Sequence, residues 1–164
     1  MRASSRTILM IFFSLLCTGA AFAQKANFSG TWNIDTTKID FGSAPHWVLP
    51  VKFQVVQSGE KATITRTITS QDGKETSRTL DLVPGTTTEY TTDAGDKSKC
   101  LILWNADQPG FTITLQSVKA DGSPGQSYEE TWFLADGGKT LVINRSVEQA
   151  NGLKYSIKAF YNKQ

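Results

Sequence analysis

Residues 28–32 read Phe-Ser-Gly-Thr-Trp and open the first of a series of strand-like segments. Gly30 permits a tight bend and a close backbone approach. Trp32 is large enough to plug one end of a small β-barrel. Gly30 and Trp32 are therefore expected to be structural residues of a fold whose interior can hold a ligand, although the motif does not identify one.

Strand-like segments recur roughly every 10–15 residues along the rest of the chain, and turn residues bound each of them. Asp-Gly and Asn-Gly pairs separate several of the segments, as tight antiparallel hairpins require. No segment shows a sustained helical period of apolar residues. The expected strands are 28–34, 51–57, 62–70, 76–83, 87–92, 99–104, 111–119, 127–134, 140–147 and 153–162.

Consecutive hairpins of this kind close most simply into an all-β, antiparallel up-and-down β-barrel of about 8–10 strands, which leaves no exposed sheet edge. Residues 24–164 are about one domain's worth of chain, enough to bury a core. We expect a single barrel domain and a monomer.

The two ends of the barrel segment resemble the calycin superfamily. Its fatty-acid-binding proteins begin with Phe-x-Gly-Thr-Trp and finish on a basic, aromatic strand, similar to residues 158–163 here, Lys-Ala-Phe-Tyr-Asn-Lys. Residues 35–50 are too short and too rich in Pro and Gly for the helical lid of those proteins. The family's interior arginine also has no counterpart, because Trp132 stands in its place and Lys158 is the nearest basic residue. The chain looks closer to lipocalin-like domains of exported bacterial proteins, which continue with Asp-Phe-Gly as at residues 40–42.

The N-terminus has the pattern of a secretory signal. Arg2 and Arg6 precede an apolar stretch at 8–16, and Ala-Phe-Ala at 21–23 is typical of a cleavage site. We expect residues 1–23 to be a signal peptide cleaved after Ala23, and the mature protein to be periplasmic or extracellular. The apolar stretch is too short to span a membrane.

Charge and composition exclude several functions. The chain has 17 Lys and Arg and 15 Asp and Glu, and loss of the two signal arginines leaves a balanced domain. Such a domain has no electrostatic attraction for nucleic acid or an anionic membrane. One histidine and one mature cysteine, Cys100, argue against a metal site or cofactor, and no catalytic motif is present. We expect Cys100 to be a small buried side chain and the protein not to be an enzyme.

Side chains alternate between the two faces of a strand. On several strands this alternation places a charged residue on a face that is otherwise apolar and is expected to point into the barrel. Arg66 stands between Ile64 and Ile68, and Arg78 shares a face with Leu80. Two further charges lie on the apolar faces of 127–134 and 140–147; these are Glu130 and Arg145.

Charges on an apolar face must be paired or solvated. In one interpretation a hydrated barrel interior uses Arg66, Arg78 and Arg145 to bind a ligand carboxylate. In a second, Glu130 pairs with Arg145 across the adjacent hairpin, and the other arginines lie near strand ends or on a solvated face. In a third, Arg145 packs over Trp32.

Aromatic side chains are the second group of residues that could line a ligand cavity in the barrel. Trp104, Trp132 and Tyr155 are candidates for a ligand cavity, although most aromatics of such a chain belong to its core. His46 and Trp47, in the Pro-flanked loop, could rim the open barrel end or plug it.

The sequence therefore predicts an exported, non-enzymatic lipocalin-like protein that carries or senses a small apolar or amphipathic molecule. The alternative is a protein–protein interaction or inhibitor module that uses the barrel loops. The carrier needs a hollow interior of mixed character. The interaction module needs a packed interior and an exposed apolar patch near residues 48–51 or in the long loop that precedes them.

Overall fold

The computed structural model describes residues 25–45, 48–92 and 95–164 of the chain. The signal peptide expected at 1–23, its cleavage point, and the pair His46 and Trp47 lie outside the described residues. No helix in the described ranges is long and apolar enough to cross a membrane.

All ten expected strands are present, and each agrees with its predicted segment to within a few residues at either end. They are β1 (Gly30–Ile34), β2 (Lys52–Ser58), β3 (Lys61–Thr69), β4 (Glu75–Leu82), β5 (Thr87–Thr91), β6 (Lys97–Trp104), β7 (Gly110–Val118), β8 (Pro124–Ala135), β9 (Thr140–Glu148) and β10 (Lys154–Lys163). A single 3₁₀ turn, η1 (Asp136–Gly138), joins β8 to β9.

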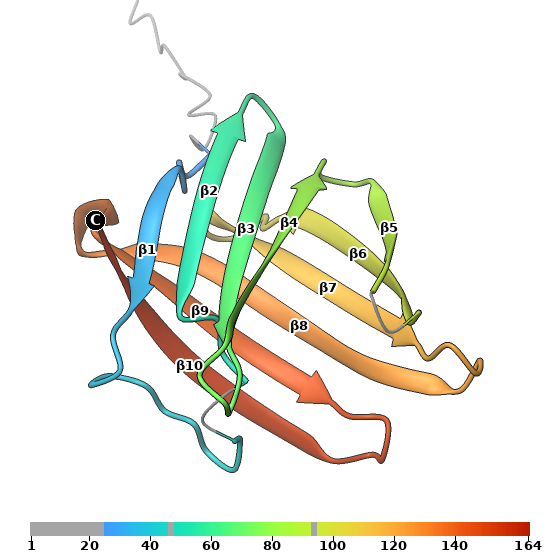
Figure 1. Cartoon of the computed structure of the whole chain (residues 1–164). Coiled ribbons are helices and arrows are strands. Elements are labelled where there is room, and N and C mark those ends of the chain that lie inside the picture. Colours follow the sequence, from blue (N-terminus) through green and yellow to red (C-terminus); the bar gives the residue numbers. More distant parts are fainter. Residues whose placement is uncertain (1–24, 46–47, 93–94) are drawn as a thin grey trace, which may run out of the picture.

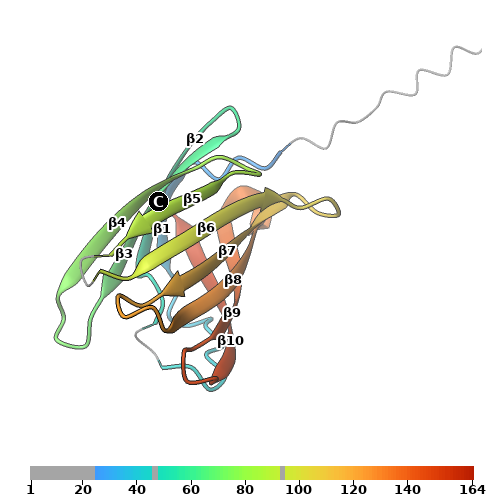
Figure 2. The ribbon, with the colours of Figure 1, turned by 90° about the vertical axis from the view of Figure 1, so that its right-hand side faces the viewer.

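The strands form one antiparallel sheet in the order β4-β3-β2-β1-β10-β9-β8-β7-β6-β5. Strands that are consecutive in sequence pair as hairpins except at β4 and β5, while β1 pairs with β10 and joins the two ends of the chain. The sheet curls into a nearly closed barrel (Figures 1 and 2). The predicted all-β up-and-down barrel is confirmed.

A seam remains between β4 and β5, which share no strand pairing. The Thr88 hydroxyl donates to the Asp81 carbonyl across the seam, at 3.2 Å. Further along, the guanidinium of Arg78 on β4 lies 5.0 Å from the ring centroid of Tyr90 on β5. Side chains therefore bridge the place where a fully closed barrel would have a ladder of backbone hydrogen bonds.

Aromatic side chains fill one end of the barrel, which we call the closed end. The Phe53 ring lies 4.7 Å from Trp132 and 4.9 Å from Tyr161 in edge contacts, and Phe28 lies 4.6 Å from Phe111. All five are at most 1% exposed. Such pairs stabilise the core beyond the burial of their area.

The motif at 28–32 anchors this closed end. Trp32 is fully buried, and its indole nitrogen donates to the Phe28 carbonyl at 2.9 Å. Gly30 has a φ of +141°, and a Cβ added there would meet the Lys163 side chain at 2.8 Å. That backbone angle favours glycine, and a larger residue would also have to displace the Lys163 side chain from its place over Trp32. The structural role expected for Gly30 and Trp32 is consistent with this geometry.

One sequence interpretation is wrong at this end. The cation over the Trp32 ring is Lys163, 5.1 Å from its centroid, and not Arg145. Arg145 instead lies over Tyr128, at 4.3 Å. The cause is position along the barrel: β10 pairs directly with β1 and brings Lys163 opposite Trp32, whereas Arg145 lies in the other half of β9.

The connection between β1 and β2 contains no helix in its described residues, as its Pro and Gly content predicted. Its last part folds across the barrel interior: Leu49 and Pro50 are buried, and Val48 and Val51 are half-buried. The Tyr161 hydroxyl donates to the Pro50 carbonyl at 3.0 Å and fixes this segment from inside the barrel.

Truncation of Trp32 should be costly because its fully buried indole fills the closed end and its ring nitrogen donates to the Phe28 carbonyl. We expect Trp32→Ala to lower the free energy of unfolding by about 3–5 kcal/mol. Urea denaturation of this variant, beside Gln54→Ala on the exposed outer face of β2, measures the difference. Equal midpoints for the two variants would contradict the assigned role of Trp32.

Candidate functional site

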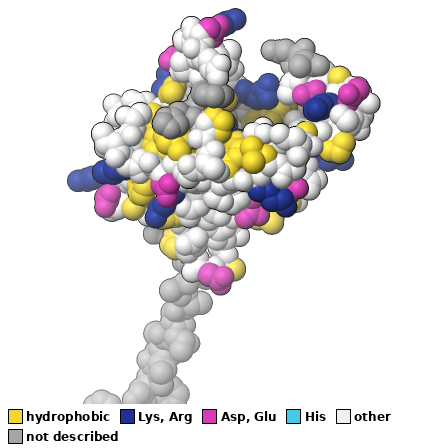
Figure 3. Space-filling view, turned by 90° about the horizontal axis from the view of Figure 1, so that it is seen from below, with side chains coloured by type: hydrophobic (Ala, Val, Ile, Leu, Met, Phe, Trp, Pro, Cys, Tyr) yellow, Lys and Arg dark blue, Asp and Glu magenta, His cyan; other side chains and the backbone are white. Residues whose placement is uncertain are grey.

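A cavity of about 910 Å³ occupies the half of the barrel away from the closed end. It opens among the β3–β4, β5–β6, β7–β8 and β9–β10 turns, and we call this opening the mouth. In Figure 3, which views the molecule from below, the surface is hollowed, and hydrophobic and basic side chains are interspersed around the hollow.

The cavity lining is mixed in character. Apolar surface comes from Ile68, Leu80 and Leu115, and two tyrosines contribute rings that end in hydroxyls. Threonine, serine and glutamine side chains occupy much of the rest. The charged lining residues in the described part of the chain are Arg66, Arg78, Lys119 and Arg145, which are basic, and Asp96, which is acidic.

Glu130 lies behind this lining and is the best buried charge of the described residues, at 1% exposed. Its two carboxylate oxygens accept from the two terminal nitrogens of Arg66, at 3.1 and 2.8 Å. The indole nitrogen of Trp132 donates to the same carboxylate at 3.0 Å. Because β3 and β8 are not neighbours in the sheet, this two-pronged ion pair crosses the barrel interior.

Arg145 completes the cluster from β9. It stands directly opposite Glu130 in the β8–β9 register, with its Nε 3.7 Å from a carboxylate oxygen. At that distance the two attract electrostatically but form no hydrogen bond, and the buried Nε has no acceptor in the described chain. One terminal nitrogen of Arg145 donates to the Val48 carbonyl at 3.0 Å, so the cluster also holds the β1–β2 connection.

Burial and charge act in opposite directions on Glu130. Burial disfavours its charged form, but the charges of Arg66 and Arg145, together with the Trp132 and Arg66 hydrogen bonds, outweigh that effect and lower the pKa of this carboxyl. For Arg66, burial is likewise overcome by Glu130, and the pKa of the guanidinium is raised. The pair is therefore ionised at neutral pH.

Tyr128 lies between the two arginines, 5.6 Å from Arg66 and 4.3 Å from Arg145, measured from each guanidinium carbon to the ring centroid. Its hydroxyl oxygen accepts from Arg66 at 3.0 Å. Burial raises the pKa of this phenol to about 12, so Tyr128 keeps its proton and adds no negative charge to the cluster.

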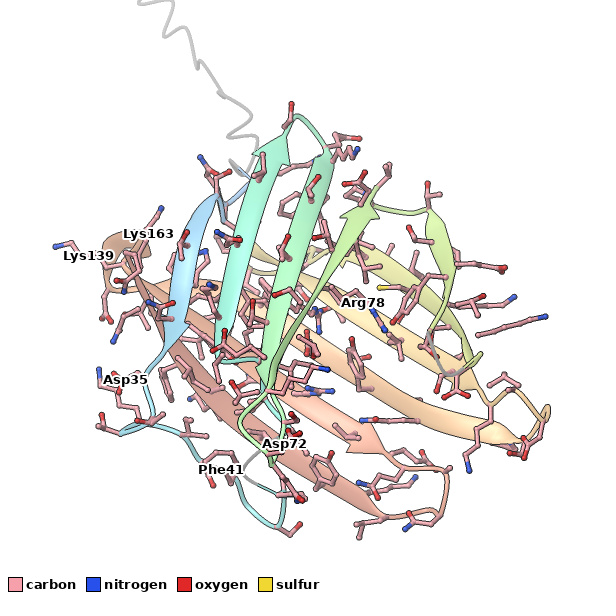
Figure 4. All side chains as sticks on the ribbon, viewed as in Figure 1. Asp35, Phe41, Asp72, Arg78, Lys139 and Lys163 are labelled. Atoms are coloured by element: carbon pink, nitrogen blue, oxygen red, sulfur yellow. The ribbon has the colours of Figure 1, made fainter. Side chains whose placement is uncertain are left out.

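Arg78 differs from the other two arginines. It is exposed, and within the described residues its guanidinium makes no ion pair or hydrogen bond, only the contact with the Tyr90 ring. It stands directly opposite Arg66 in the β3–β4 register. Figure 4 shows Arg78 on β4 at the seam, whereas Lys139 and Lys163 lie at the far end of the barrel.

The structure brings four of the seven predicted ligand-binding residues together at the cavity. Arg66, Arg78 and Arg145 line it, and Glu130 supports them. Trp132 belongs to the closed end and does not line the cavity, but it contacts the cluster through its indole nitrogen and through its ring, whose centroid lies 5.8 Å from the Arg66 guanidinium carbon. The remaining two do not line the cavity: Trp104 packs against Phe111, 5.7 Å away, and Tyr155 is a buried core residue beneath a shallow hollow on the outer face of β7–β10.

The second sequence interpretation of the charges was right about one pair and wrong about Arg66. Glu130 does face Arg145 across the β8–β9 hairpin, but its closest partner is Arg66, which is only 11% exposed in its side chain and is not solvated. Register arguments relate neighbouring strands only, so they could not identify a contact across the barrel.

Sequence reasoning overlooked Tyr128 and Tyr90 as partners of the arginines. A signal for Tyr128 is present in the sequence, because a spacing of two residues puts it on the same face of β8 as Glu130 and beside the charge. Tyr90 had no comparable signal, because its role depends on the seam. Cys100 is buried at 1% exposed, as expected. The described residues contain no cluster of side chains that could hold a metal ion.

Comparison with solved structures shows the fold. The barrel is similar to zebrafish ileal bile acid-binding protein complexed with cholic acid, with a TM-score of 0.51, 17% sequence identity, and coverage of 84% of this chain and 98% of that chain. It is also similar to a protein described as REP1-NXSQ fatty acid transporter, with a TM-score of 0.54, 12% identity, and coverage of 84% and 96%. The chain has a calycin-like fold. No protein-family model and no curated protein sequence matches it.

The pair formed by Arg66 and Glu130 should be strongly coupled. Removing one partner leaves the other buried without its counterion, at a cost of about 3–5 kcal/mol, while removing both costs less than the sum. A double-mutant cycle with Arg66→Met and Glu130→Gln, measured by urea denaturation, tests this expectation. The exposed pair Lys99 and Glu89, at 3.0 Å, is the control, and its coupling should be several-fold smaller. Equal coupling in the two cycles would argue against a buried pair.

The lowered pKa of Glu130 also predicts a pH dependence. The unfolded chain binds a proton at this carboxyl more readily than the folded protein does. The contribution of Glu130 is therefore complete above its ordinary pKa of 4.5 and is lost as the pH falls toward its lower folded value.

The measurement is the difference in unfolding free energy between the wild type and the double variant Arg66→Met/Glu130→Gln, taken from pH 7 downward. Other carboxyls also have lowered pKa values; for example, a hydrogen bond from Thr37 helps to lower the pKa of Asp35 to about 2. They are present in both proteins, so their contributions cancel in the difference. We expect the wild type to lose more stability than the variant below about pH 4.5. Parallel curves would show that Glu130 does not titrate as described.

Proposed function

We propose that the protein is an exported, non-enzymatic carrier or sensor that binds a small amphipathic molecule in the barrel cavity. The observation that carries this proposal is the cavity itself. Ligand sites in proteins have volumes of about 300–1,000 Å³ and combine apolar walls with a few polar groups. The cavity of about 910 Å³ has both features.

The character of the lining supports an amphipathic ligand over a purely apolar one. Leu80, Leu115 and Tyr128 offer contact surface for an apolar body, while Arg78 and Arg145 offer donors to a polar end. A purely apolar molecule would remove these charges from water without compensating them. The two similar structures also support the proposal, since one is titled a bile acid-binding protein and the other a fatty acid transporter.

The interaction module is the weaker candidate because it needs a packed interior, whereas the barrel contains the cavity, and because residues 48–51 form no exposed apolar patch. Leu49 and Pro50 are buried, and Val48 and Val51 are half-buried. Large exposed hydrophobic side chains elsewhere in the described chain, such as Val56, Leu103 and Leu153, lie on different strands or loops. Scattered residues of this kind are ordinary for a protein surface.

Filling the cavity should abolish binding without unfolding the protein. Thr76 on β4 lines the cavity yet is exposed, so a larger side chain there meets open space. We expect Thr76→Trp to weaken the binding of a dansyl-undecanoyl probe at least about tenfold because it occupies the space that the ligand needs. The probe's fluorescence enhancement on titration gives the affinity.

Gln54→Trp adds the same side chain to the exposed outer face of β2 and serves as the control. Its affinity for the probe should equal that of the wild type. A wild type that binds no probe, or a Thr76→Trp variant that binds as well as the control, would overturn the cavity as the binding site. Native mass spectrometry of protein from its own host then identifies a co-purifying molecule by mass.

A further inference from the structure

The three arginines of the cavity have unequal access to counterions. Both terminal nitrogens of Arg66 donate to Glu130, and one of them also donates to Tyr128. A guanidinium bound at two points by a carboxylate is occupied in the manner in which arginines recognise ligand carboxylates. Glu130 therefore stands where an acidic ligand would otherwise engage Arg66.

Arg145 keeps a positive charge that no carboxylate in the described chain satisfies by a hydrogen bond. Its side chain is 9% exposed, and its ion pair with Glu130 is long, at 3.7 Å. Its one hydrogen bond among these residues goes to the neutral Val48 carbonyl. A buried cation without a bonded counterion is unfavourable unless an anion reaches it.

Arg78 adds a second uncompensated charge beside the first pair. Like charges directly opposite one another on adjacent strands are destabilising, yet Arg78 and Arg66 occupy such a position on β4 and β3. Glu130 compensates only Arg66 of these two. The cavity therefore collects three guanidiniums against the single buried carboxylate within the described structure. The other charged lining residues, Lys119 and Asp96, are opposite in sign, so the excess charge is on Arg78 and Arg145.

We propose that Arg78 and Arg145 bind the anionic group of the ligand, a carboxylate or a comparable singly charged oxyanion, and that Glu130 keeps Arg66 from doing so. This proposal rests on the proposed cavity function and deepens it. The acid is held by the two arginines of the lining that have donors to spare, and the buried Arg66–Glu130 pair remains intact beneath it.

Tyr128 and the residues at the mouth support an orientation in which the anionic group of the ligand lies at the arginines and its uncharged part points toward the mouth. The Tyr128 oxygen already accepts from Arg66, so its proton is available to a ligand oxygen and adds a neutral donor beside Arg145, whose guanidinium lies over the Tyr128 ring. Lining residues nearer the mouth include Ile68, Ser117 and Gln126. These residues would contact the uncharged part of the ligand, which extends from the arginines toward solvent.

The test compares two probes that differ in charge and by one methyl group, dansyl-undecanoic acid and its methyl ester. We expect the wild type to bind the acid about a hundredfold more tightly than the ester, because charge-assisted hydrogen bonds to the two arginines form only with the acid and each arginine contributes about tenfold. Arg78→Gln should lose about tenfold in acid affinity and leave ester affinity unchanged. Lys139→Gln makes the same charge change at the far end of the barrel and should alter neither.

A second variant separates Arg66 from the site. Arg66→Met/Glu130→Gln removes one positive and one negative charge together, so the cluster keeps its net charge. Arg145 loses its long ion pair with Glu130 and keeps its donors for the ligand, so we expect the acid affinity to be no more than about threefold weaker than that of the wild type. Thermal unfolding of each variant confirms that the barrel is folded before titration.

The outcomes are distinguishable. Equal affinity for acid and ester in the wild type overturns the anion site while the cavity still binds. So does an Arg78→Gln variant that behaves like Lys139→Gln, or a pair variant that binds the ester but has lost the acid, which would make Arg66 the anchor. A wild type that binds neither probe overturns the proposed function and, with it, this inference.

Discussion

The ion pair between Arg66 and Glu130 is the constraint on which the rest of this barrel depends. It joins β3 to β8 through the interior, 64 residues apart in sequence, and sets the boundary between the two halves of the barrel. On one side of it the aromatic side chains pack to exclude water. On the other side lies the cavity. An apolar pair at these positions could be as stable, so its charge is better explained by what it does to the neighbouring site than by stability alone.

The closed end and the seam complement that pair. Edge contacts among the aromatic rings around Trp132 leave no space for a ligand, and the indole nitrogen of Trp132 links this packing to the Glu130 carboxylate. At the seam, β4 and β5 lack backbone pairing along their length. Arg78 is consequently exposed at the cavity and free of the packing that fixes Arg66, while Tyr90 is half-buried against the core.

Much of the fold could be predicted from the sequence because its signals are local. Turn residues and alternation located all ten strands, and the same alternation placed Arg66, Glu130 and Arg145 on interior faces. The contacts between those residues could not be predicted, since Arg66 reaches Glu130 across the barrel, where no register rule applies. The roles of Trp104 and Tyr155 could not be predicted either. Both are aromatic and substantially buried, but burial alone does not distinguish a residue of the core from a residue that lines the cavity.

The buried carboxylate of Glu130 gives the cavity of this chain a charge distribution that the calycin-like fold alone does not determine. Similar structures at 12–17% identity show the fold alone, and the cavity here has its own electrostatics. Glu130 cancels one buried charge and leaves the excess on the two arginines that differ most in burial: Arg145 at 8% exposed and Arg78 on the exposed strand. An anion held between them would be partly desolvated by Arg145 and partly open to solvent beside Arg78. Such a site strengthens attraction on its buried side and keeps release possible on its open side, which suits a carrier that must give up its ligand.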